Sequence, residues 1–143
     1  LGWSHLALNG AGLIMVWLFF EREFRAIEWL AIFVACGLGV TLGLFVFDPG
    51  LIWYVGLSGL LHGLFIAGAL QTLRGEPVFS GILLVGFGAK LVYEQFAGSL
   101  PGTAEMSGGP VVVNSHLYGA IAGLFIGLVF LFSKQIRDKQ PDS

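Results

Sequence analysis

Charged side chains are scarce in this chain. Lys, Arg, Asp and Glu make up 11% of its 143 residues, whereas a soluble globular chain carries about 25%. The 7 basic residues are fewer than the 9 acidic ones, and they form no basic patch of the kind that binds nucleic acid. The composition therefore argues against a soluble domain, and we expect no nucleic-acid partner.

Cysteine is scarcer still, since Cys36 is the chain's single thiol. One cysteine cannot form an internal disulfide, and it cannot supply the set of thiolates that a structural metal needs. We expect neither a metal site nor a cofactor.

Hydrophobic residues fill the chain instead, at 56%, together with 22 glycines. They form five apolar stretches that approach the ~20 residues needed to cross a bilayer. These are about 3–20, 27–47, 51–73, 78–96 and 115–132. Backbone groups in lipid must be satisfied within their own segment, so each stretch is expected to be helical. The sequence predicts an all-α, polytopic membrane helical bundle, with a Gly-rich loop at 97–113 that is either a cap or a plain connector.

The basic residues predict how the bundle is oriented. Six of the seven fall on one side of a five-span alternation: Arg22, Arg25, Arg74, Lys134, Arg137 and Lys139. Basic residues accumulate on the cytoplasmic side, so we expect a cytoplasmic carboxyl terminus. Polar side chains from three spans then share one depth, in the outer halves of their helices. They are His5, Asn9, Ser58, His62 and His116.

Ser58 and His116 are the first candidates for chemistry. A hydroxyl is a weak nucleophile unless a base takes its proton, and an imidazole is the usual base. Glycines at four-residue spacing would let the two helices approach closely; they are Gly59 and Gly63 on one and Gly119, Gly123 and Gly127 on the other. We expect a catalytic dyad; alternatively, Ser58 is a small packing residue and His116 an interfacial polar one.

His62, His5 and Asn9 have less certain roles. His62 lies four residues after Ser58 on the same helix face, so it competes for the role of base or supports His116 by packing or hydrogen bonding. His5 and Asn9 also share a face, and their side chains could donate to an oxyanion beside the Ser58 backbone N–H. Hydrogen bonding between helices explains that pair equally well.

Lys90 and Glu94 are an ionisable pair inside the fourth apolar stretch. Mutual pairing is the economical explanation, because neither charge should be alone in lipid. A proton-relay role would need further partners, and the sequence indicates none.

Three motifs resemble those of the rhomboid intramembrane proteases. Gly56-Leu57-Ser58-Gly59 is similar to their G-x-S-G motif, 116–123 resembles their His-x-x-Gly-x-x-x-Gly helix, and 5–9 resembles their His-x-x-x-Asn motif. The resemblance implies a serine endopeptidase with Ser58 as nucleophile and His116 as general base. It also implies that His5 and Asn9 help to hold the oxyanion, and that no acid completes a triad.

Within that family, His62 in the stretch Gly56 to Gly63, together with the segment 90–95, looks most like the rhombosortase branch. This implies a multi-pass enzyme of the bacterial inner membrane with its active site toward the periplasm. Its substrates would be single-span proteins whose carboxyl-terminal sorting tail has a Gly-Gly motif, a membrane helix and a basic end. The family core has six helices and five are counted here, so we expect residues 1–143 to be an amino-terminally truncated peptidase domain.

Three alternatives stay open. The chain could be a general rhomboid protease with other single-span substrates, or a non-catalytic rhomboid-like protein that binds and escorts membrane helices. It could also be a small transporter or channel subunit, with Lys90, Glu94 and the histidines lining a path. A transporter needs ionisable groups spread through the membrane depth, whereas most of these are expected at one level.

Overall fold

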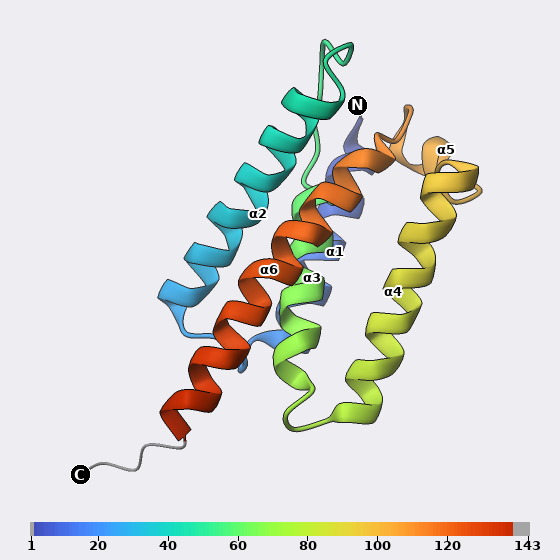
Figure 1. Cartoon of the computed structure of the whole chain (residues 1–143). Helices are drawn as coiled ribbons and strands as arrows, with labels where there is room; N and C mark the ends of the chain where they lie inside the picture. Colours follow the sequence, from blue (N-terminus) through green and yellow to red (C-terminus); the bar gives the residue numbers. More distant parts are fainter. Residues whose placement is uncertain (1, 139–143) are drawn as a thin grey trace.

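The computed structural model describes residues 2–138, which form six helices and no strand. The helices are α1 (Trp3–Phe20), α2 (Ala26–Phe47), α3 (Ser58–Thr72), α4 (Pro77–Ala97), α5 (Thr103–Ser107) and α6 (Val113–Asp138), as Figure 1 shows. Lys139, one of the residues used to predict orientation, lies outside the described residues.

Four of these helices, α1, α2, α4 and α6, are long and apolar enough to cross a membrane. Their ends agree with the expected spans within a few residues, except that α6 continues beyond Phe132. Large apolar side chains cover their outward faces, among them Phe45 at 79% exposure and Phe125 at 72%. In water such a surface would be costly, whereas lipid accepts it. The predicted all-α membrane bundle is confirmed.

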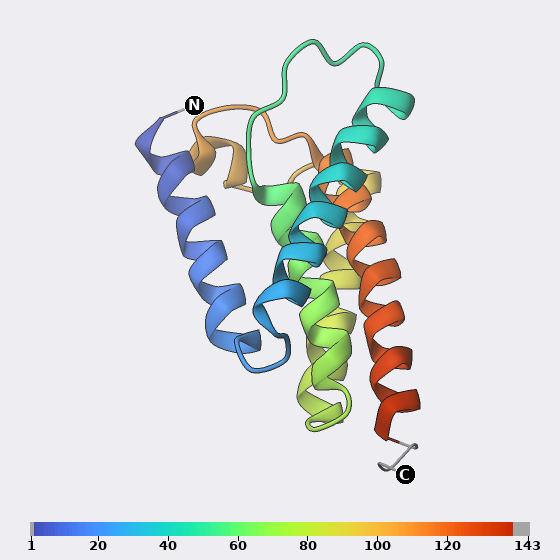
Figure 2. The same cartoon turned by 90° about the vertical axis from the view of Figure 1, so that its left-hand side faces the viewer.

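The third expected span, 51–73, is wrong in its first part. The helix α3 begins only at Ser58, and residues 51–57 form a non-helical segment that arches over its outer end (Figure 2). Gly56 in that segment has a φ of +149°, which side-chain-bearing residues rarely adopt. With 15 residues, α3 is about 22 Å long, shorter than the ~30 Å hydrocarbon core. Ser58 is therefore the first residue of a recessed helix.

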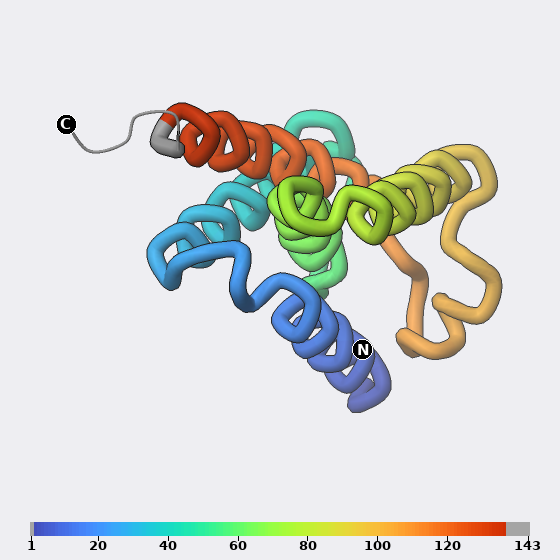
Figure 3. The backbone as a smooth tube through the Cα atoms, turned by 90° about the horizontal axis from the view of Figure 1, so that it is seen from below, coloured from blue at the N-terminus to red at the C-terminus, as the bar shows by residue number. Residues whose placement is uncertain are grey.

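The helix α3 is the centre of the bundle. Every residue from Gly59 to Thr72 is buried, and Figure 3 shows α1, α2, α4 and α6 arranged around it. A helix that is apolar on all sides is stable only where neighbours cover all of it. Groups at the outer end of α3 are thus held at the centre of the protein.

Glycine brings α3 and α6 into backbone contact. A Cβ on Gly119 would overlap the carbonyl oxygen of Gly59, and one on Gly123 would overlap the backbone of Gly63. We call this contact the glycine seam; its members are Gly59, Gly63, Gly119 and Gly123. Small residues that allow such close approach are typical of helix pairs in membranes. The seam fixes α3 and α6 relative to each other just below Ser58 and His116.

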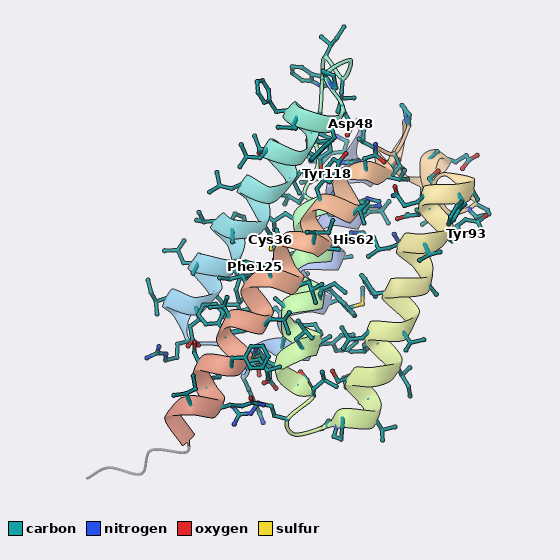
Figure 4. The ribbon with its side chains drawn as sticks, in the orientation of Figure 1. Cys36, Asp48, His62, Tyr93, Tyr118 and Phe125 are labelled. Atoms are coloured by element: carbon teal, nitrogen blue, oxygen red, sulfur yellow. The ribbon has the colours of Figure 1, made fainter. Side chains whose placement is uncertain are left out.

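Asp48 joins α2 to α6 at the outer end of the bundle. Its carboxylate accepts a hydrogen bond from Asn114 Nδ2 at 2.6 Å and another from the Tyr118 hydroxyl at 2.7 Å. Figure 4 shows Asp48 and Tyr118 together at the top of the two helices. The Tyr118 ring also packs against Gly43, where a Cβ would overlap it. These contacts hold the first turns of α6, the part of the helix that carries His116.

Candidate active site

Ser58 and His116 meet at the outer end of the glycine seam. Ser58 is the first residue of α3 and His116 lies in the first turn of α6. The distance from Ser58 Oγ to His116 Nε2 is 3.1 Å, within hydrogen-bonding range. His116 is only 4% exposed. The two candidate residues are separated by 58 positions in sequence, and the fold brings them into direct contact.

His62 contacts both members of this pair, through the Ser58 carbonyl and the His116 ring. Its Nδ1 lies 2.6 Å from the Ser58 carbonyl oxygen, and its Nε2 lies 2.8 Å from Lys90 Nζ. The rings of His62 and His116 stack with their centroids 4.1 Å apart and an interplanar angle of 11°. Both nitrogens of His62 are engaged elsewhere, so the geometry favours a supporting contact over the role of base.

Lys90 and Glu94 form the expected ion pair, with Lys90 Nζ 2.7 Å from Glu94 Oε1. The expectation that they have no further partners is wrong. Glu94 Oε2 lies 2.9 Å from His116 Nδ1, and Lys90 also contacts His62. An acid therefore stands beside the histidine, where the sequence led us to expect none. The missed signal was the ion pair itself, because an ionisable pair in a membrane span marks a functional site more often than not.

His5 and Asn9 of α1 line the same site from the other side. The ring Nε2 of His5 is buried and has no hydrogen-bond partner among the described residues. It lies close to Gly56, since a Cβ there would be 3.2 Å from His5 Nε2 and 3.8 Å from Ser58 Oγ. Asn9 is 8% exposed, and its Nδ2 donates to the His5 carbonyl at 2.9 Å. His5 thus has a free nitrogen near Ser58, while the Asn9 amide is bonded to its own helix.

These groups surround a cavity of about 620 Å³. Its walls come from α1, α3, α4, the first turn of α6, the segment before α3 and the loop between α4 and α6, which contains α5. Thr103 and residues 107–112 of that loop line the cavity, so the loop covers the site and is more than a connector. No side chain caps the amino terminus of α3. The free N–H groups of its first turn are therefore donors beside Ser58.

The arrangement also bears on metal binding. His62, Glu94 and His116 offer ligand atoms within 4.8 Å of one another. The Lys90 ammonium already contacts two of these three residues, and its charge would repel a metal cation. Hydrogen bonds explain the cluster without a metal.

Comparison with known proteins identifies one family. A sequence model described as Rhomboid domain matches residues 1–133. No curated protein and no solved structure was found to match the chain. The matched range contains all residues of the candidate site.

Proposed function

The chain belongs to the rhomboid family of multi-pass membrane proteins, and from this premise we propose that it is an intramembrane serine endopeptidase. Ser58 is the nucleophile and His116 the general base. The observation that carries the proposal is the 3.1 Å contact between Ser58 Oγ and His116 Nε2. A nucleophile and a base within hydrogen-bonding reach, in a cavity open to a substrate, are the minimum for acyl transfer.

The reaction begins when Ser58 Oγ attacks a peptide carbonyl and passes its proton to His116 Nε2. The carbonyl oxygen becomes an oxyanion, which needs donors already in place. The free Nε2 of His5 and the uncapped start of α3 supply them, and the positive end of the α3 dipole adds to the effect. Asn9 can also donate, because its amide has a second N–H besides the one bonded to His5.

His116 then returns the proton to the departing amine, and the peptide bond breaks. Ser58 keeps the acyl group as an ester until water hydrolyses it, with His116 again acting as base. The cavity supports this step, since both Ser58 and His116 line it. A substrate helix must unwind locally to expose its carbonyl, so small residues are expected next to the cleaved bond.

For the substrate, we propose the carboxyl-terminal sorting tails of exported proteins, with a Gly-Gly motif, a membrane helix and a basic end. The support is the resemblance of Gly56 to Gly63, with its histidine, and of 90–95 to rhombosortases. The enzyme would lie in the bacterial inner membrane, with its site toward the periplasm and its carboxyl terminus in the cytoplasm. The distribution of basic residues supports this orientation.

The test is cleavage of a co-expressed reporter that ends in such a tail. The wild type is compared with Ser58→Ala, His116→Ala and His62→Ala, and Ser133→Ala, an exposed serine of α6, serves as the matched control. We expect no cleavage with the first two variants, reduced cleavage with the third and wild-type cleavage with the control. Cleavage that survives Ser58→Ala would overturn the mechanism.

Substrate controls separate the remaining possibilities. Reporters with unrelated single-span helices, cleaved where the sorting tail is not, would indicate a general rhomboid protease. Binding of membrane helices without cleavage of any reporter would indicate an escort protein.

A further inference from the structure

Glu94 is an unusual residue for its helix. The helix α4 is largely exposed, and its buried residues are Ser80 and Glu94. Glu94 is 2% exposed, so its carboxylate is taken out of water and requires partners. It has one for each oxygen: Lys90 Nζ at Oε1 and His116 Nδ1 at Oε2. The contact with Lys90 is enough to balance the two opposite charges. The contact with His116 therefore needs a separate explanation.

The position of each proton in the cluster follows from which groups can only donate or only accept. The Ser58 carbonyl oxygen can only accept, so His62 Nδ1 must carry a proton and donate to it. A neutral His62 then has an acceptor at Nε2, which faces Lys90 Nζ. Lys90 has three N–H groups and no acceptor, so it can donate to both His62 and Glu94.

The same reasoning continues from Glu94 to the nucleophile. An ionised carboxylate only accepts, so His116 Nδ1 must carry the proton that faces Glu94. His116 Nε2 is then the acceptor for the Ser58 hydroxyl. The whole cluster therefore admits one consistent set of protons, and it holds His116 in the tautomer that a general base needs.

We propose that Glu94 is a positioning residue that completes a Ser58–His116–Glu94 triad, with Lys90 and His62 holding its carboxylate in place. The catalytic part of this inference rests on the proposed protease function. When His116 takes the Ser58 proton it becomes positively charged, and the carboxylate at 2.9 Å stabilises that charge. Lys90 does not oppose it, because its own contacts are with His62 and Glu94.

The competing explanation is that Glu94 serves only as the counter-ion of Lys90. Two variants separate the explanations. In Glu94→Gln, Lys90 competes for the single amide oxygen, which turns the NH₂ group toward His116 Nδ1 and favours the wrong tautomer. In Lys90→Met/Glu94→Leu both charges are gone. If the two residues only balanced each other's charge, this double variant should keep the wild-type kcat. Glu105→Gln is the matched control, because Glu105 is exposed in α5 and does not line the cavity.

Kinetics of the full chain in lipid vesicles give the first readout. We expect kcat to fall at least about 100-fold in both Glu94→Gln and the neutral double variant, with little change in KM, since loss of the acid acts on the chemical step. Glu94→Asp should recover part of kcat. Wild-type kcat in the double variant would overturn the inference and leave Glu94 as a counter-ion.

A second readout does not depend on activity. The chain has 3 histidines, so ¹⁵N NMR of labelled imidazoles can be assigned with His5→Ala and His62→Ala. We expect the His116 proton at Nδ1 in the wild type and at Nε2 in Glu94→Gln. A wild-type His116 protonated at Nε2 would overturn the triad. If no reporter is cleaved, the protease proposal fails while this spectrum still decides the role of Glu94.

Discussion

Two helices that pack on α3 hold it by different means. At the glycine seam, the backbone of α6 lies directly against the backbone of α3. The helix α4 instead contacts α3 through side chains. The rings of Phe65 and Phe87 stack with centroids 3.7 Å apart, and the Ser80 hydroxyl donates to the Ala69 carbonyl. The seam brings serine to histidine, and α4 brings the carboxylate to the histidine.

This difference implies different tolerance to change. Two backbones in contact have no rotamers with which to absorb an added atom, whereas side chains can repack at modest cost. Substitutions in the seam should therefore damage folding and activity together. Substitutions in α4 should damage activity through the position of Glu94 and leave most of the bundle intact.

The largest effect is expected for Gly119→Ala in the seam. Its new methyl would overlap the Gly59 carbonyl oxygen, which is backbone and cannot move aside. We expect loss of cleavage and a fall in the free energy of unfolding of about 3 kcal/mol, at the upper end for an overpacked site. Gly86→Ala in α4 is the matched control, because a Cβ there meets open space. Denaturant unfolding in detergent measures both, and equal stability of the two variants would contradict the account of the seam.

A smaller effect is expected for Phe87→Ala, which removes the ring that joins α4 to α3. Phe87 also contacts the His62 ring, with centroids 5.5 Å apart. We expect a loss of about 2 kcal/mol in the free energy of unfolding, since the ring is half-buried, and a kcat roughly 10-fold lower. Phe96→Ala is the control, because Phe96 is on the same helix and 90% exposed. Wild-type kcat for Phe87→Ala would mean that the side-chain contact does not position α4.

The smallest effect is expected at the outer end of the bundle, for Tyr118→Phe. It keeps the ring against Gly43 and removes the hydrogen bond to Asp48 Oδ2. A hydrogen bond to a charged group contributes at least about 1.5 kcal/mol. Because Asp48 and Tyr118 are both half-buried, we expect a loss at this lower end in the free energy of unfolding, with nearly unchanged kcat. Tyr93→Phe, at the exposed rim of α4 in Figure 4, should change neither. A large fall in kcat for Tyr118→Phe would show that the Asp48 contact reaches the site.

The sequence predicted those parts of the fold that follow from the need for apolar helices long enough to cross a lipid bilayer. The bounds of α1 and the end of α2 follow from apolar runs that stop at charges or at Asp48-Pro49-Gly50. The shared depth of Ser58, His62 and His116 followed from counting residues along each span. The start of α3 could not be predicted in this way, because residues 51–55 are as apolar as a membrane helix, yet they are not helical in the structure.

The contact of Glu94 with His116 was also beyond the sequence. It depends on how α4 is rotated against α3 and α6, and the two residues are separated by 22 positions on different helices. No local spacing encodes that rotation. By contrast, the i, i+4 pairing of Lys90 with Glu94 is local, and it was predicted.

The central claim is that His116 activates Ser58, and labelling with a fluorophosphonate tests it most directly. This probe reacts with an activated serine and requires no knowledge of the substrate. The full chain in lipid vesicles would be compared with its His116→Ala and His62→Ala variants, with the modified residue located by mass spectrometry. The account predicts an adduct at Ser58 in the wild type, labelling at least about 100-fold slower in His116→Ala, and a smaller loss in His62→Ala. Labelling of Ser58 that is unaffected by His116→Ala, or an adduct at another serine, would contradict it.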